Sequence, residues 1–146
     1  MAIQRDTFPL PDVDDPLVAP YFAGAARGEL VVPQCDGCHR YVWYPEEVCP
    51  GCGGVLTWTP VSGRGTLFTW VVVRRAFLPA FEDKVPFVSA LIALAEDPAV
   101  RIVAYVDAEP AALVADQPVH VEFRPLAFST VPGKEVVVPW FVPSSS

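Results

Sequence analysis

The chain has 146 residues, which is enough for one domain or for one domain with a small appendage. Its hydrophobic fraction of 52% and charged fraction of 18% fit two alternatives: apolar surface that a partner covers, or a Val-rich β protein that simply has a dense core. The formal net charge of −7, with Lys84 and Lys134 as the only lysines, argues against binding a nucleic-acid backbone, because that binding depends on Lys and Arg.

The same composition bears on location. No run of about 18 apolar residues occurs, so no transmembrane helix is expected. The N-terminal stretch MAIQRDTFPLPDVDD lacks the apolar segment of a signal peptide. All four cysteines are close together in the sequence, which suits a metal site in a reducing compartment better than a disulfide framework. We therefore expect a cytoplasmic protein.

Residues 1–30 predict an arm followed by a helix. The first fifteen residues are rich in proline and aspartate and predict an extended arm. The next segment, DDPLVAPYFAGAARGEL, predicts an amphipathic helix of about three turns, because its apolar residues recur at helical spacing. Asp14 or Asp15 can cap this helix, Pro16 suits its first position and Gly28 can end it.

Residues 31–61 predict a zinc ribbon. Two CxxC motifs, CDGC and CPGC, are separated by ten residues and lie between a strand at LVVPQ and a strand at VLTWTPVSG. Two such turns facing each other place four sulfurs at tetrahedral geometry, about 2.3 Å from one metal ion. The predicted ligands of one structural zinc ion are Cys35, Cys38, Cys49 and Cys52.

Two alternatives to zinc stay open at this stage. Iron fits the same four sulfurs, although the short gap between the motifs favours zinc, and two disulfides suit a cytosolic protein poorly. His39 is not expected to be a ligand, because four thiolates already complete the coordination. Gly37, Gly51 and Gly53 are expected to allow a strained backbone around the cysteines.

Residues 62–146 predict a five-stranded barrel. β-Branched and aromatic residues dominate five segments separated by turn signals: TLFTWVVVRRAF, FVSALIALAED, VRIVAYVDA, PVHVEFRPL and EVVVPWFV. The segment AEPAALVADQ, between the third and fourth, predicts one helical turn. This order is typical of an OB-fold. The predicted fold class is therefore mainly β: an N-terminal helix, a four-cysteine zinc ribbon and an OB-fold barrel.

The sequence offers little for catalysis. Its two histidines, His39 and His120, stand apart from any nucleophile motif, and no phosphate-binding glycine loop precedes a helix. The SGRGT segment predicts a turn that enters the barrel. We therefore expect that the chain is not an enzyme on its own.

Three stretches together carry a family resemblance: PYFAGAARGELVVPQCDGCHRYVWYPEEVCPGCGG, WTPVSGRGTLFTWVVV and PFVSALIALAEDPAVRIVAYV. They resemble bacterial and archaeal proteins that join a rubredoxin-like zinc ribbon to a C-terminal OB-fold and that associate with acyl-CoA enzymes. The resemblance runs from about residue 20 to the end. Two segments depart from the family pattern: the short FSTVPGKEVVVPWFVP, and AALVADQ, which lacks a common glycine.

The resemblance implies an accessory role in lipid metabolism. Partners in the family are thiolases, thiolase-like aldolases and hydroxymethylglutaryl-CoA synthases. In actinobacterial steroid catabolism a similar domain is fused to a hotdog-fold enoyl-CoA hydratase and recruits a lipid-transfer-protein-like aldolase. The chain is thus expected to dock on and stabilise a thiolase-like or aldolase subunit of steroid side-chain or fatty-acyl degradation, to share acyl-CoA as a ligand and to line its channel.

Two sets of residues are weaker candidates for contacts in such a complex. Guanidinium groups suit phosphates, so the candidates for the phosphates of CoA are Arg64, Arg74 and Arg75. Aromatic side chains dominate interface energies, so the candidates for the partner interface are Trp43, Tyr44, Phe77 and Phe81. The alternatives are a solvated strand end for the Arg74–Arg75 pair and core packing for the aromatic residues.

Two other functions compete with the accessory role. A free-standing acyl-CoA binding protein needs no enzyme partner. A nucleic-acid binding module also uses ribbons and OB-folds, but it needs a basic groove that the net charge disfavours.

Overall fold

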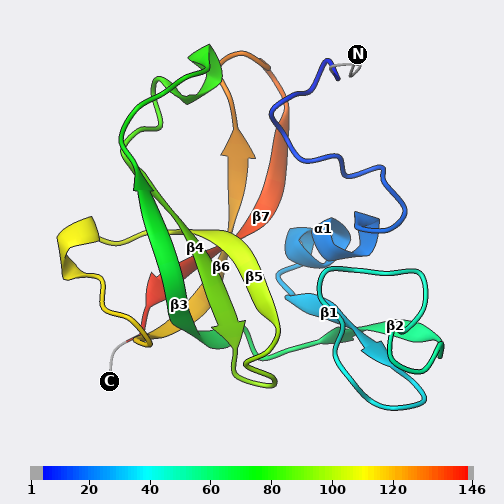
Figure 1. Ribbon diagram of the computed structural model, residues 1–146. Coiled ribbons are helices and arrows are strands. Elements are labelled where there is room, and N and C mark those ends of the chain that lie inside the picture. Colours follow the sequence, from blue (N-terminus) through cyan, green and yellow to red (C-terminus); the bar gives the residue numbers. More distant parts are fainter. Residues whose placement is uncertain (1–4, 145–146) are drawn as a thin grey trace.

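A two-stranded antiparallel sheet and a closed five-stranded barrel form the β-structure, with a single helix packed beside them (Figure 1). The structure is a computed structural model and describes residues 5–144. The observed order, helix, ribbon and then barrel, confirms the predicted fold class.

Helix α1 spans Ala19–Ala26 and is shorter than the sequence predicted. The backbone before it forms a turn, in which the Asp15 carboxylate accepts a hydrogen bond from the amide of Leu17 at 3.0 Å. Asp15 therefore stabilises this preceding turn, and the predicted cap by Asp14 or Asp15 with Pro16 as the first helical residue is wrong. Pro20 falls in the first turn of the helix, where its missing N–H costs no hydrogen bond.

The ribbon strands follow the helix directly. Strand β1 (Val31–Cys35) pairs antiparallel with β2 (Leu56–Pro60), and Cys35 lies opposite Leu56. The residues between these strands, 36–55, form the loops that contain the other three cysteines. The ribbon therefore presents its metal-binding loops at one end of a short hairpin.

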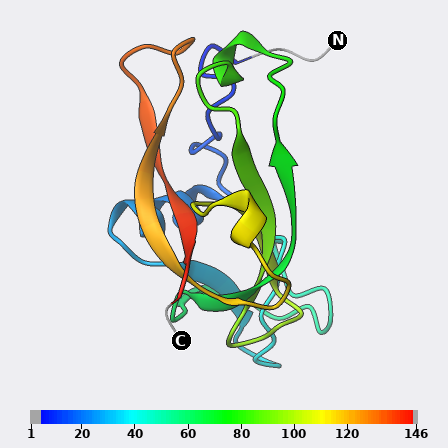
Figure 2. The ribbon, with the colours of Figure 1, turned by 90° about the vertical axis from the view of Figure 1, so that its left-hand side faces the viewer.

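The barrel has the strand order β3-β4-β5-β7-β6 and closes where β3 pairs with β6 (Figure 2). This is the OB-fold order, with a parallel contact between β5 and β7. Two 3-10 turns join strands: η1 (Pro79–Phe81), between β3 and β4, and η2 (Pro110–Ala112), which is the helical turn predicted between the third and fourth barrel strands. The strands are β3 (Arg64–Val73), β4 (Phe87–Leu94), β5 (Arg101–Val106), β6 (Pro118–Ala127) and β7 (Glu135–Pro143).

One continuous core joins these parts. Leu67, Ile92 and Phe141 are fully buried inside the barrel, and Tyr21 of the helix and Val32 of the ribbon belong to the same cluster. Burial of such side chains contributes about 1.5–3 kcal/mol each, so helix and ribbon are held against the barrel.

The N-terminal arm is also attached to the barrel. Leu10 is 2% exposed and packs in a second cluster with Leu126 and Phe128. None of the helices among the described residues is long and apolar enough to cross a membrane.

Candidate metal centre

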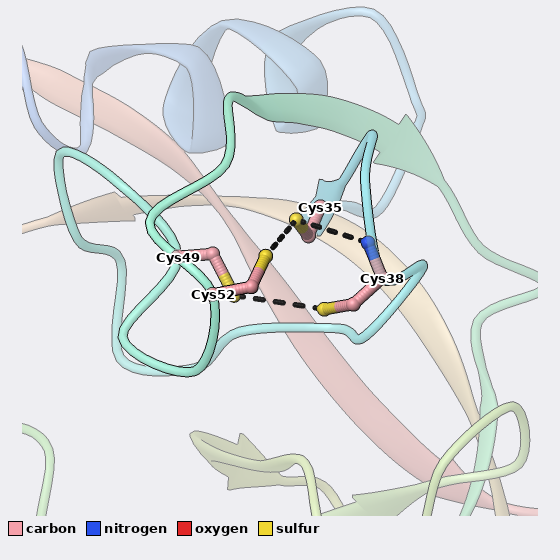
Figure 3. Close-up of side chains that lie close together, drawn as sticks. All are labelled: Cys35, Cys38, Cys49 and Cys52. Carbon is pink, nitrogen blue, oxygen red and sulfur yellow. Dashed lines mark hydrogen bonds between the residues drawn. The ribbon is translucent and has the colours of Figure 1, made fainter.

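The four cysteines converge at the end of the ribbon (Figure 3). Their sulfur atoms all lie within 4.8 Å of one another. The Sγ atoms of Cys35 and Cys52 are 3.4 Å apart, and those of Cys38 and Cys49 are 3.7 Å apart. Sulfurs at the corners of a tetrahedron about 2.3 Å from a zinc ion are separated by about 3.8 Å. The residues therefore fit one four-coordinate zinc ion, whereas a disulfide needs about 2.05 Å between its sulfurs.

Backbone amides of both CxxC turns point at the first cysteine of each turn. The amide of Cys38 donates to the Sγ of Cys35 over 3.4 Å, and it lowers the pKa of the Cys35 thiol to about 6, although burial opposes this shift. The amide of Cys52 lowers the pKa of Cys49 in the same way. The pKa of Cys52 is raised to about 11, chiefly by the neighbouring sulfur of Cys35. A bound cation would remove the proton that the sulfurs share, because metal-bound thiols are deprotonated.

Gly54 has no side chain at the place where two of the sulfur atoms lie. A Cβ atom at Gly54 would lie 2.8 Å from the Sγ of Cys35 and 3.2 Å from the Sγ of Cys52. No sequence argument singled out this residue, although its place directly after Cys52-Gly53 was a signal for it. Gly37 also faces both sulfurs, but at an ordinary contact distance of 3.7 Å.

The residues that follow the two CxxC turns adopt the strained backbone, and this corrects one expectation. Positive φ angles occur at Gly53 (74°) and at His39 (62°), each directly after the second cysteine of its turn. Gly37 and Gly51 do not have positive φ angles, so the strain assigned to them from the sequence was wrong. His39 is exposed, and its contribution is a backbone carbonyl that accepts a hydrogen bond from Gln34 at 3.1 Å.

The three candidate arginines do not converge. Arg64 begins β3, while Arg74 and Arg75 follow its end. Arg74 follows Arg64 by ten positions, which corresponds to about 33 Å of extended strand at about 3.3 Å per residue. Arg74 and Arg75 remain a candidate pair for a phosphate, and Arg64 stands alone.

The aromatic candidates divide into partly buried and exposed members. Trp43 packs on Tyr21 with ring centroids 5.0 Å apart, and Phe81 packs on Phe128 at 5.2 Å, so both take part in the cores. Tyr44 is 62% exposed and Phe77 is 85% exposed. Tyr44 and Phe77 are therefore accessible to a partner, which a residue of the interface has to be.

No catalytic constellation is built around the histidines within residues 5–144. His120 lies in β6, where its Nδ1 is 3.0 Å from the hydroxyl of Ser144. His39 lies in the ribbon, on a different part of the fold. The described residues thus bring together one chemical site, the four cysteines, and a four-cysteine site leaves no open position for a substrate.

Fold and site together define a class of protein, a zinc ribbon joined to an OB-fold barrel. Residues 22–56 match the family model described as "ChsH2, rubredoxin-like zinc ribbon domain", and residues 58–124 match "ChsH2, C-terminal OB-fold domain". The chain therefore belongs to the ChsH2 family.

Solved structures agree with this assignment. A chain described as "Ltp2-ChsH2(DUF35) aldolase" is 25% identical, with a TM-score of 0.76 over 91% of this chain and 98% of that chain. A DUF35 protein of unknown function from Sulfolobus solfataricus is 9% identical, with a TM-score of 0.56 over 89% of this chain and 87% of that chain, and it shows the fold alone. No curated protein matches the chain significantly.

Proposed function

We propose that this chain is a non-catalytic accessory subunit that docks on a thiolase-like acyl-CoA enzyme, specifically a lipid-transfer-protein-like aldolase, and stabilises it. The observation that carries this proposal is the match to a chain of the Ltp2-ChsH2 aldolase, which covers 98% of that chain. Because the match extends over nearly the whole of both chains, the proposed role rests on similarity to a complete subunit and not to one motif.

Two features of the chain support an accessory role. The cysteine site has four protein ligands for one metal ion, which is the arrangement of a structural zinc site. Large apolar side chains are also exposed, including Phe77 at 85%, Val103 at 66% and Tyr44 at 62%. The exposed aromatic residues among them, Phe77 and Tyr44, are of the type that anchors protein interfaces.

We propose that one zinc ion is bound by Cys35, Cys38, Cys49 and Cys52 and stabilises the ribbon. The ion supplies charge neutralisation for four thiolates, and the ribbon residues hold it by the amide and glycine arrangement described above. Metal analysis of the purified chain should give one zinc per chain. One iron per chain in place of zinc would contradict the assignment. So would disulfides, detected as cysteines that do not react with a thiol reagent after the chain is denatured.

The partner proposal is tested by co-expression. The lipid-transfer-protein-like aldolase of the same organism is produced alone and together with this chain, followed by size-exclusion chromatography and an assay of carbon–carbon bond cleavage in a CoA thioester. We expect co-elution, and a higher yield and activity of the aldolase when the chain is present. An aldolase that is equally soluble and active alone, and that elutes separately, would refute the proposal.

A pair of variants tests the exposed aromatic contact. Phe77→Ala should weaken the complex by about 2 kcal/mol, the typical effect of losing an aromatic anchor. Val114→Ala is the matched control, because Val114 is also well exposed, at 63%. The competing function, a free-standing acyl-CoA binding protein, would be favoured if the isolated chain bound acyl-CoA with no partner present.

We further propose that the complex acts on a steroid side-chain or fatty-acyl CoA thioester. In this proposal, the CoA group is bound with the help of Arg64, Arg74 and Arg75. The distance along β3 means that the Arg74–Arg75 pair and Arg64 would meet different groups. Alanine at the Arg74–Arg75 pair should raise the KM of the complex for a CoA thioester and leave the melting temperature unchanged, because both side chains are exposed.

A further inference from the structure

Half of strand β3 has an unpaired edge. The barrel closes through Arg64–Thr66 of β3 and Pro118–His120 of β6, and beyond this point the two strands diverge (Figure 2). Leu67 still exchanges backbone hydrogen bonds with Asp116 and Gln117, at 2.7 and 3.0 Å. Phe68 is the irregularity in the ladder, and from Thr69 to Val73 β3 pairs only with β4.

The direction of the free backbone groups follows from the ladder. Leu67 directs its N–H and C=O away from β4, toward residues 116 and 117. Backbone direction alternates along an antiparallel strand, and the irregularity at Phe68 moves the alternation by one residue. Trp70 and Val72 therefore direct their N–H and C=O groups to the open side.

Strand β6, which borders the same opening, is protected against pairing. It contains Pro125, which has no N–H, and the ion pair between Arg124 and Glu122. Proline and charged residues are the usual means of blocking an edge strand. Residues 67–73 of β3, LFTWVVV, contain neither, and Val71 is 60% exposed and Phe68 42% exposed. This edge therefore has the properties of a template for another strand.

Charge distinguishes between the possible occupants. Arg74 and Arg75 follow the free edge, and the ion pairs of the described residues involve only Arg27 and Arg124 among the arginines. Antiparallel pairing of Phe68–Val73 in two copies would place Arg74 and Arg75 of one copy opposite Leu67 and Thr66 of the other, and neither of these residues carries a carboxylate. Opposite charges across strands stabilise the pairing, and a second copy does not supply them there. A second copy is thus disfavoured, and a strand that carries carboxylates is favoured.

We propose that Phe68–Val73 of β3 accepts one extended strand of the partner subunit, which adds to the barrel edge through Trp70 and Val72 and carries carboxylates that meet Arg74 and Arg75. This inference rests on the proposed function, because it assigns the surface by which the chain docks. Addition of a strand to a free sheet edge is a common mode of recognition, in which main-chain hydrogen bonds give affinity. Antiparallel pairing, the more stable arrangement, places the carboxylates before the apolar run of that strand.

Hydrogen exchange tests the edge directly. The full chain is compared alone and in complex with the co-expressed aldolase of the same organism. The amides of Trp70 and Val72 should exchange rapidly in the free chain and become at least about tenfold slower in the complex, because they gain an acceptor. The amides of Thr69 and Val71, which bond to β4, serve as internal references.

Two variants of one residue separate the amide from the side chain. Val72→Pro removes the outward N–H but no bond to β4, and Val72→Ala shortens the side chain and keeps the N–H. The proline variant should bind the aldolase about tenfold more weakly than the alanine variant, since one main-chain hydrogen bond is lost. The melting temperature of each variant reports on folding, and the exchange experiment on the natural chain decides the question if the proline variant does not fold.

The outcomes separate this inference from the proposed function. If no complex forms with the natural chain, the proposed function itself fails. If the complex forms but exchange at Trp70 and Val72 is unchanged, docking is real and the edge assignment is wrong. If the free chain is a dimer that Val72→Pro dissociates, the occupant is a second copy, and the assignment to a partner strand is overturned.

Discussion

Gly54→Ala tests the metal centre by adding a single methyl group. The backbone at Gly54 has no positive φ, so alanine is compatible with it. The new Cβ would lie 2.8 Å from the Sγ of Cys35, whereas non-bonded heavy atoms of this kind normally stay about 3.5 Å apart or more. The methyl group therefore displaces the sulfur, and the displacement acts on the metal-binding geometry and not on a distant core.

The size of the effect follows from overpacking. Forcing one methyl group into a filled site costs about 1–3 kcal/mol. If this cost falls on the metal-bound state, the affinity for zinc drops on the order of 10- to 100-fold. Competition with a chromophoric zinc chelator measures this drop, and metal analysis shows whether the content stays at one ion per chain.

Gly37→Ala is the matched control. A Cβ at Gly37 would lie 3.7 Å from the same two sulfurs, which is ordinary contact. Its zinc affinity should stay within about threefold of the natural chain, because no atom has to move. Equal affinities for the Gly54 and Gly37 variants would refute the argument that Gly54 is required by the close approach of the sulfurs.

Three further predictions concern stability. His39→Gly should stabilise the chain by about 1 kcal/mol by relieving a positive φ of 62°, while zinc content stays at one ion; a drop in that content would instead make His39 a ligand. Phe141→Ala should lower the free energy of unfolding in urea by about 3–5 kcal/mol, because Phe141 is fully buried, and a loss under about 1 kcal/mol would contradict its core position. Burial raises the pKa of Tyr21 far above its ordinary value of about 10. The contribution of Tyr21 to the free energy of unfolding is fully present below about pH 10. It is lost as the pH rises toward the raised pKa of the folded state, because only the unfolded state ionises there. Measured against pH, the free energy of unfolding of Tyr21→Phe should lack this loss.

The cysteine site was predictable because its determinants are local. Each CxxC turn brings two sulfurs to one side through a few residues of backbone, so spacing alone indicates a tetrahedral site. Similarly, the β-branched and aromatic residues of segments such as VRIVAYVDA, together with the turn signals between them, predicted strands, and the five segments with a helical turn indicated an OB-fold.

Helix α1 shows where local signals compete. The sequence offered Asp14, Asp15 and Pro16 as a helix start, and the chain uses Asp15 in the turn that directly precedes the helix, four residues before Ala19. Both conformations satisfy the same side-chain hydrogen bonds, since aspartate is favoured in turns and at caps alike. Packing of Tyr21 against the barrel accompanies the helix that actually forms.

The sequence by itself determined the chemistry of the ribbon and the number and order of the elements, because these depend on residue type and on spacing over short distances. Tertiary structure alone decided that Trp43 and Phe81 belong to cores while Phe77 faces outward, that Arg64 lies a strand length from Arg74, and that β3 leaves half of its edge unpaired. The physical reason is that burial and strand pairing join residues far apart in the chain, and one strand pattern is compatible with a paired or an open edge.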